Sequence, residues 1–128
     1  MRKVKAKKSS ISTISATELS ELCVSLIQDK KGSSIVSLDL SNIPEAITDY
    51  FVVCHANSTI QVRAILDYID EEVKNRVGVK PIHVEGRSNA EWCLIDFGDV
   101  IVHVFLKEKR EFYQLEDLWS DATAKMYD

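Results

Sequence analysis

Three cysteines and three histidines are the residues of this chain best suited to nucleophilic catalysis. Cys54 stands next to His55, and Cys93 lies shortly before His103, so each pair suggests a thiol–imidazole dyad. Neighbouring residues on a strand point to opposite faces, which separates the first pair. The hairpin proposed below places the members of the second pair on opposite faces as well. We therefore expect three reduced thiols in the core and no catalytic residue.

Metal binding and nucleotide transfer are the other chemistries to consider. His83, Asp96 and His103 are possible metal ligands, but no His-x-x-x-His or Cys-x-x-Cys spacing preorganises them. A nucleotidyltransferase needs paired carboxylates that hold metal and triphosphate. Asp96 and Asp99 are the available pair, and they lie on either side of a tight turn. A divergent nucleotidyltransferase-like enzyme with these two metal ligands remains the alternative to our expectation of no metal and no cofactor.

A β-hairpin is predicted around these residues. Its strands cover residues 91–97 and 100–106, and Gly98-Asp99 forms a two-residue turn, for which glycine at the first position is typical of type II′ geometry. This register places Trp92 opposite Phe105 and Leu94 opposite His103.

The two faces of this hairpin differ in composition. The first face is entirely apolar and is expected to be core: Cys93, Ile95, Phe97, Val100, Val102 and Val104. The second hairpin face carries Trp92, Leu94, Asp96, Ile101, His103 and Phe105. Large aromatic side chains next to Asp and His are typical of an interface. The alternative is that a helix of the same chain covers this second face, with His103 and Asp96 paired at its margin.

Two helices are predicted before the hairpin. The first begins at the capping box Ser15-Ala-Thr-Glu18, continues with an apolar stripe, and ends at Gly32. The second begins at Asn57 or Ser58 and ends at Gly78. Its buried stripe comprises Val62, Ile65, Leu66, Ile69 and Val73.

The remaining segments complete an α/β pattern. Residues 34–40 alternate as a half-buried strand, and residues 50–54 form an apolar run typical of a central strand. Residues 79–85 predict a strand at a sheet edge, or one that begins after Pro81. Residues 107–128 predict a short, partly helical closing segment. The expected fold class is α/β, with a mixed sheet of about five strands flanked by helices.

Charge is distributed unevenly along the chain. The net charge is -4, but residues 2–8 contain five of the sixteen basic residues, and the other eleven face all 20 acidic residues, a balance of -9. We expect a basic, disordered tail over residues 1–14 and a single domain over residues 15–128. The acidic domain does not resemble a general nucleic-acid coat. No apolar stretch approaches the ~20 residues that span a bilayer, so we expect no membrane association and a cytoplasmic protein. The alternative is mitochondrial, because the tail is basic and rich in serine.

Four sequence strings carry a family resemblance. They are Thr48-Asp49-Tyr50-Phe51-Val-Val53, Val84-Glu85-Gly86, Glu91-Trp92-x-Leu94-Ile-Asp96-x-Gly98-Asp99-Val-Ile-Val-His103-Val and Arg110-x-Phe112-Tyr113-x-Leu115-Glu116-x-Leu118-Trp119. In this order and spacing they resemble the ribosomal silencing factor family, also called Iojap. The resemblance extends over about residues 17–122.

The resemblance implies a translation repressor without enzymatic activity. Such a protein binds the large ribosomal subunit through its fourteenth protein and sterically blocks joining of the small subunit, especially under nutrient limitation. The family fold is similar to a nucleotidyltransferase sandwich without an active site. Family members also form dimers, and a purely structural homodimer is a further alternative. We add the expectation of a weak ribosomal RNA contact by the basic tail, which lies outside the match.

The resemblance also suggests which residues act. Its motifs assign the partner-facing surface to Trp92, Leu94, His103, Tyr113 and Leu115. They assign an orienting role, through hydrogen bonds and charge, to Glu85, Asp96, Asp99 and Arg110. Trp119 is assigned to packing. The chain departs from the family pattern where His55-Ala56 replaces the usual Thr-Gly and where Ile60 replaces an arginine early in the second helix.

Overall fold

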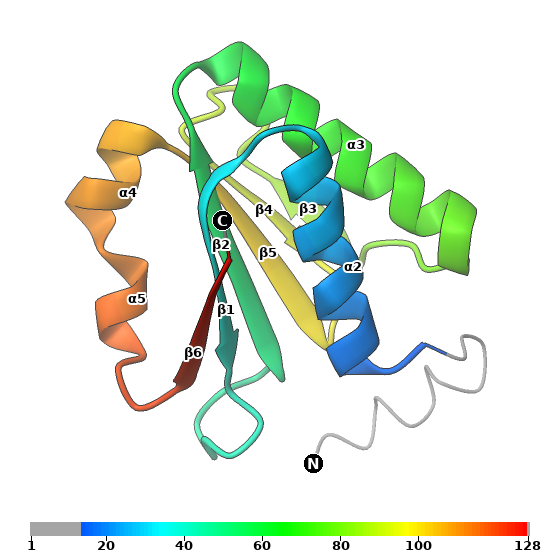
Figure 1. Cartoon of the computed structure of the whole chain (residues 1–128), viewed down its shortest axis with the longest axis vertical. Helices are drawn as coiled ribbons and strands as arrows, with labels where there is room; N and C mark the ends of the chain where they lie inside the picture. The colour runs from blue at the N-terminus through cyan, green and yellow to red at the C-terminus, as the bar shows by residue number, and fades with distance from the viewer. Residues whose placement is uncertain (1–13, 128) are drawn as a thin grey trace.

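The fold was analysed in a computed structural model, which describes residues 14–127. The expected disordered tail over residues 1–14 lies, apart from Ile14, outside the described residues. Figure 1 shows the arrangement of the elements. In chain order they are α2 (Ala16–Asp29), β1 (Ser33–Asp39), β2 (Tyr50–Ala56), α3 (Thr59–Val77), β3 (His83–Glu85), β4 (Trp92–Asp96), β5 (Val100–Leu106), α4 (Lys107–Tyr113), α5 (Leu115–Leu118) and β6 (Thr123–Tyr127).

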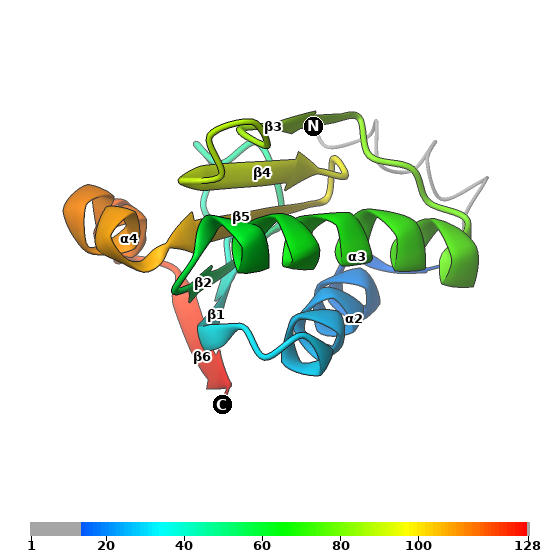
Figure 2. The ribbon, with the colours of Figure 1, turned by 90° about the horizontal axis from the view of Figure 1, so that it is seen from above.

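The strands form one open mixed sheet. Its order is β3-β4-β5-β2-β1-β6, in which β2 and β5 are parallel and the other neighbours are antiparallel. Helices α2 and α3 cover one face, and α4 and α5 lie against the other (Figures 1 and 2). The mixed α/β prediction is confirmed, with one strand more than expected, and β2 lies inside the sheet as its apolar run predicted.

Local sequence signals explain how the two long helices begin and end. The Ser15 hydroxyl accepts a hydrogen bond from the Glu18 amide, and the Glu18 carboxylate accepts one from the Ser15 amide, both at 3.0 Å. Helix α3 begins after Ser58 and ends at Gly78 in the left-handed region. The predicted end of α2 at Gly32 is wrong, because the helix ends at Asp29 and the residue with positive φ that follows it is Lys31, at 64°. Gly32 is needed instead for close packing, since a Cβ there would collide with Ile27.

The hairpin register is confirmed. Trp92 pairs with Phe105 and Leu94 with His103, and Phe97 donates its amide hydrogen to the Val100 carbonyl at 2.9 Å. Gly98 has a φ of 94°, which explains the glycine at this turn position. The apolar face of the hairpin packs into the core beneath α2 and α3, as predicted.

The two outermost strands compare differently with the sequence-based expectation. Strand β3 lies at the edge of the sheet and begins after Pro81, as expected for residues 79–85, and it is only three residues long. The closing segment is helical at first, as expected, but it ends in strand β6, which pairs with β1 and was not predicted. None of the helices in residues 14–127 combines the length and the apolar composition that a membrane-spanning helix requires.

Candidate docking surface

A hydrogen bond between Trp92 and His103 organises the second hairpin face. The indole Nε1 of Trp92 donates to Nδ1 of His103 at 3.0 Å. His103 is only 4% exposed, and burial lowers its pKa to about 4. At neutral pH the imidazole is therefore uncharged, with its proton on Nε2, and it can accept the indole hydrogen.

An aromatic row leads from the core to the surface. We define it as Phe105, Trp92, Tyr113 and Phe112, in the order in which their rings are in contact. The ring of Trp92 lies 4.9 Å from that of Phe105 and 4.7 Å from that of Tyr113, and the rings of Tyr113 and Phe112 are 5.1 Å apart. Phe105 is fully buried, whereas Tyr113 is 45% and Phe112 76% exposed. The row thus presents large apolar area on a support that the core holds rigid.

The chain itself covers part of the second hairpin face. His103 on β5 and Leu115 on α5, which the family resemblance assigned to the partner-facing surface, are both buried. Trp92 and Leu94 are half-buried, and Tyr113 is exposed. The alternative of cover by a helix therefore applies to part of this face. The pairing of His103 with Asp96 that this alternative included is wrong, because His103 accepts from Trp92 and Asp96 accepts from the Gly98 amide. We call Trp92, Leu94, Tyr113 and Phe112 the docking surface.

Arg110 fixes α4 and α5 to the sheet through hydrogen bonds of its side chain. Its side chain donates to the Glu116 carboxylate through Nε at 3.2 Å and Nη2 at 2.6 Å. Nη1 donates to the Ser34 carbonyl at 2.7 Å and to His55 Nδ1 at 3.0 Å. Ser34 lies at an irregularity of β1 with a φ of 50°, so a local distortion of the strand accompanies this contact. Arg110 is 9% exposed. Its buried side chain links four elements: α4, α5, β1 and β2.

His55 has a role that the sequence did not predict. Burial lowers the pKa of its imidazole below the ordinary value, and the nearby Arg110 charge lowers it further. A neutral His55 can accept the hydrogen bond from Arg110, whereas a protonated ring cannot accept at Nδ1. The only sequence signal was that this position departs from the family pattern.

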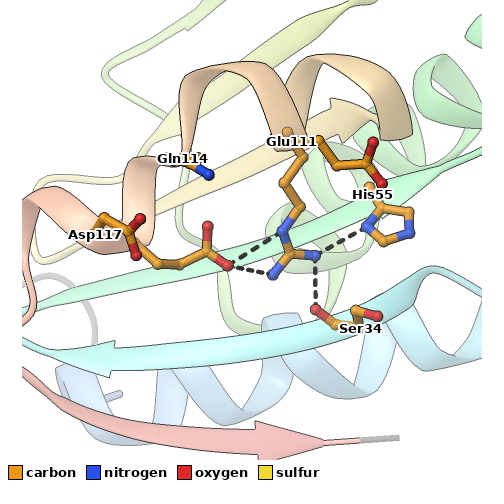
Figure 3. Close-up of a pocket in the computed structure, with 7 residues that line it drawn as sticks. Ser34, His55, Glu111, Gln114 and Asp117 are labelled. Atoms are coloured by element: carbon orange, nitrogen blue, oxygen red, sulfur yellow. Dashed lines mark hydrogen bonds and ion pairs between the residues drawn. The ribbon is translucent and has the colours of Figure 1, made fainter.

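A cavity of ≈ 310 Å³ opens beside Arg110 (Figure 3). It is lined by Ser34, His55, Arg110, Glu111, Gln114, Glu116 and Asp117. Within residues 14–127, no group of three or more His, Cys, Asp or Glu side chains could hold a metal ion. The acidic rim, with Arg110 already bound to Glu116, is suited to a basic partner group.

The predicted supporting carboxylates occupy the margin of the hairpin. Asp96 accepts the Gly98 amide hydrogen at 2.8 Å and thereby holds the turn. Oε2 of Glu85 lies 3.2 Å from Nε2 of His83, and Nδ1 of His83 lies 3.9 Å from Oδ2 of Asp96. The backbone carbonyl of Asp99 accepts hydrogen bonds from two amides at the start of β2.

A side chain of helix α3 holds the loop that precedes Trp92. Arg63 donates to the carbonyls of Arg87 and Ser88 at 3.0 and 2.7 Å, contacts that sequence reasoning missed. Gly86 has a φ of 85°, and a Cβ there would collide with the backbone of Trp92. The loop therefore fixes the backbone position from which the indole projects.

The cysteines take no part in this surface. All three are buried and free, and burial raises the pKa of Cys23 and Cys54 to about 12 and that of Cys93 to about 11. Thiols with such pKa values are not nucleophiles at neutral pH. The prediction of core thiols is confirmed.

Comparisons with known proteins agree on one family. The model of the family described as "Ribosomal silencing factor during starvation" matches residues 13–128. The protein named "Ribosomal silencing factor RsfS" of Halalkalibacterium halodurans is 43% identical over 109 residues, which cover 85% of this chain and 92% of that protein. The mouse protein named "Mitochondrial assembly of ribosomal large subunit protein 1" is 32% identical over 103 residues, covering 78% and 44%. A crystal structure of a Chromobacterium violaceum protein superimposes with a TM-score of 0.79 at 34% identity, covering 84% and 88% of the two chains.

Proposed function

The chain belongs to the ribosomal silencing factor family, which implies ribosome-associated regulation of translation, and from this premise we propose a specific mechanism. The protein binds the large ribosomal subunit through its fourteenth protein. It then sterically blocks joining of the small subunit, most of all under nutrient limitation. It acts by occupying a surface, so its effect depends on affinity and position and requires no catalytic turnover.

The observation that carries this proposal is the exposed aromatic docking surface. Phe112 and Tyr113 are exposed, and Trp92 is half-buried between Tyr113 and Phe105. An aromatic anchor whose rotamer is fixed loses little conformational entropy on binding, and such residues contribute most of the energy of many interfaces. In this proposal His103 and Leu115 support the surface from below, while Trp92, Leu94 and Tyr113 contact the partner.

Charge around this surface supports a basic partner. The cavity beside Arg110 has an acidic rim formed by Glu111, Glu116 and Asp117. The Glu85 carboxylate adds negative charge at the other side of the hairpin. Complementary charge of this kind orients the partner and speeds association more than it raises affinity. The proposed place of action is the bacterial cytoplasm, with an organelle as the alternative that the mouse relative's name suggests.

The rival enzyme reading has less support. Asp96 holds the hairpin turn through the Gly98 amide, a structural use of one of the two suspected metal ligands. A magnesium-dependent affinity for nucleotide that disappears in Asp96→Asn would favour the enzyme over our proposal. A homodimer that persists with excess large subunit would favour the purely structural reading.

Co-sedimentation with purified large subunits tests the proposal. We expect the wild-type protein to pellet with isolated large subunits and to be absent from joined ribosomes. Trp92→Ala should weaken binding by about 2 kcal/mol or more, because it removes a central aromatic anchor. Ile60→Ala, which truncates a 77% exposed side chain on α3, is the matched control and should bind normally. Unchanged binding by a folded Trp92→Ala variant would contradict the proposed surface.

A further inference from the structure

Helix α4 is joined to the sheet mainly through one side chain. It has seven residues, follows β5 directly, and begins after Leu106, whose side chain cannot cap the first turn. Among the residues of α4, all of which the structure describes, Arg110 alone is buried. The same helix carries Phe112 and Tyr113, the two exposed members of the docking surface. The position of these two rings therefore depends on what Arg110 binds.

The contacts of Arg110 fix the protonation state of His55. Nη1 of Arg110 lies 3.0 Å from Nδ1 of His55, and a guanidinium group donates hydrogen bonds but accepts none. Nδ1 must therefore accept, so the imidazole is neutral and its proton lies on Nε2. The same side chain donates to the Ser34 carbonyl at 2.7 Å and to the Glu116 carboxylate at 2.6 Å. We call these three contacts the Arg110 clamp, which is complete only with a neutral His55.

Charged side chains of both signs act on the His55 imidazole. In the described part of the chain they are Lys107, Arg110 and Glu111 of α4 and Glu116 of α5. The two cations oppose protonation of the ring, and the two carboxylates favour it. Burial is the largest influence and also opposes protonation, so the pKa of His55 lies below its ordinary value of 6.5. Its neighbours in the sheet, Ser33 on β1 and Phe105 on β5, carry no charge.

Solvent reaches His55 while the fold is intact. The imidazole is half-buried and lines the cavity of ≈ 310 Å³, whose rim also carries Asp117 (Figure 3). Proton exchange between this ring and bulk water therefore needs no opening of the core. His103 differs in this respect, because it is only 4% exposed. Of these two histidines, His55 is the one that can follow the pH of the solution directly.

Two residues at the same cavity hold a strained backbone. Ser34, whose carbonyl accepts from Arg110, has a φ of 50°, and Gln114, which joins α4 to α5, has a φ of 49°. Residues other than glycine adopt this left-handed region at a cost, and they keep it only where the surrounding contacts enforce it. Loss of one contact of the Arg110 clamp lets both segments relax, so α4 has a held and a released position.

We propose that His55 is a positioning residue for the docking surface, through which the proton regulates affinity for the large subunit. With a neutral ring, the Arg110 clamp holds α4 and Tyr113 packs on Trp92. A protonated ring carries a hydrogen on Nδ1, so it cannot accept from Arg110 and it repels the guanidinium. Helix α4 is then released, and the aromatic row is broken between Trp92 and Tyr113. The effect on affinity rests on the proposed function, whereas the movement of α4 belongs to the free protein.

The neutral ring that the clamp requires sets the pH window. The clamp is complete above pH 6.5 and is lost as the pH falls through the lowered pKa of His55. His103, with a pKa of about 4, stays mostly neutral down to pH 5. Measurements between pH 7.5 and pH 5 therefore report on His55 with the Trp92–His103 hydrogen bond largely intact.

Two variants of residue 55 separate its charge from its shape. His55→Asn places an amide oxygen near the position of Nδ1 and cannot be protonated, so it should keep α4 held at pH 7.5 and at pH 5. His55→Leu removes the acceptor and should release α4 at both pH values. In wild type, NMR should show the amide resonances of Phe112 and Tyr113 shifting together with the ring resonances of His55 and with the same apparent pKa. His55→Asn should show no such shift of the α4 resonances.

Co-sedimentation with large subunits measures the consequence for binding. Between pH 7.5 and pH 5, the affinity of wild type should fall by about fivefold or more relative to that of His55→Asn. Taking this ratio removes the pH dependence of the ribosome and of every group that the two proteins share. Ile60→Ala keeps His55 and lies on α3, so it is the matched control and should lose affinity on acidification as wild type does.

The outcomes for the free protein and for the complex can be told apart. The proposal is overturned if the His55 ring stays neutral at pH 5, or if it titrates while the α4 resonances stay fixed. Equal pH dependence of affinity in wild type and His55→Asn would overturn it as well. If no variant binds large subunits at pH 7.5, the proposed function fails, and the α4 resonances alone decide the positioning role. Should His55→Leu fail to fold, the comparison of wild type with His55→Asn still decides.

Discussion

The indole of Trp92 and the imidazole of His103 are held together by one hydrogen bond of 3.0 Å, in which the tryptophan is the donor. The docking surface therefore rests on a histidine that must be neutral. His103 thus fixes the orientation of the Trp92 side chain, although only Trp92 reaches the surface.

Replacing the indole by a smaller ring tests this support. Trp92→Phe keeps an aromatic ring but leaves Nδ1 of His103 buried without its donor, so we expect a loss of about 1–3 kcal/mol in the free energy of unfolding. The affinity for large subunits should fall less than in Trp92→Ala, because ring contact area remains. Denaturant titration and co-sedimentation of the three proteins measure both effects. Equal affinity of the two variants would show that the ring itself contributes nothing.

Acidification should destabilise the fold through His103. Its pKa is lowered to about 4 by burial, against about 6.5 in the unfolded chain, so its stabilising contribution is complete above pH 6.5 and is lost as the pH falls toward 4. Between pH 7 and pH 5 this corresponds to about 2 kcal/mol in the free energy of unfolding. Unfolding curves of wild type and His103→Leu at both pH values isolate the contribution of His103 to the free energy of unfolding, since the other groups titrate equally in the two proteins. An identical pH dependence of the two would contradict it.

Removing the Arg110 guanidinium should loosen α4 and α5. Arg110→Met leaves the Ser34 carbonyl and the Glu116 carboxylate without their donor, and we expect a loss of about 2 kcal/mol in the free energy of unfolding. Arg76→Met breaks an exposed ion pair of 2.8 Å with Glu72 and should leave the free energy of unfolding nearly unchanged, because solvent screens such a pair. A double-mutant cycle that combines Arg110→Met with Glu116→Gln gives the coupling energy between Arg110 and Glu116. If both arginine variants lose the same amount, Arg110 has no special structural role.

A methyl group at residue 86 should displace the anchor. Gly86→Ala introduces a side chain at a φ of 85° and against the Trp92 backbone, so we expect destabilisation of about 1–3 kcal/mol together with weaker binding to large subunits. Gly78→Ala is the matched control, because its φ of 71° carries similar strain with no atom nearby. Tryptophan fluorescence should change in Gly86→Ala only. A binding loss common to both variants would assign the effect to general instability.

Salt dependence tests the expected contact of the basic tail with ribosomal RNA. The slope of log affinity against log salt concentration reports how many counterions the phosphates release. The chain with glutamine at Arg2, Lys3, Lys5, Lys7 and Lys8 should show a shallower slope than wild type. An unchanged slope in co-sedimentation would remove the tail from the interface.

Much of the fold could be predicted from local signals. The hairpin register followed from one turn and the alternation of apolar residues, and both helices began at recognisable caps. Strand β6 could not be found in this way. Its residues are mostly exposed, so they carry no apolar alternation, and the strand is defined by its backbone pairing with β1.

The site was predicted in part for a related reason. The composition of the hairpin indicated an interface, but it did not reveal which residues α4 and α5 would bury. The contact of Arg110 with Ser34 joins residues 76 positions apart, and the second contact involves His55, where the chain departs from its family. Long-range polar contacts of this kind have no periodicity by which a single sequence could show them.

The pairing of β1 with β6 has a consequence for biosynthesis. Among the strands of residues 14–127, β1 is the first to leave the ribosome, yet its outer neighbour begins at Thr123. Until that strand is synthesised, the edge of β1 carries unpaired amides and carbonyls, which are open to pairing with another nascent chain. Contacts between such distant segments also slow folding. A protein proposed to restrain translation thus depends on late events of its own synthesis to close its sheet.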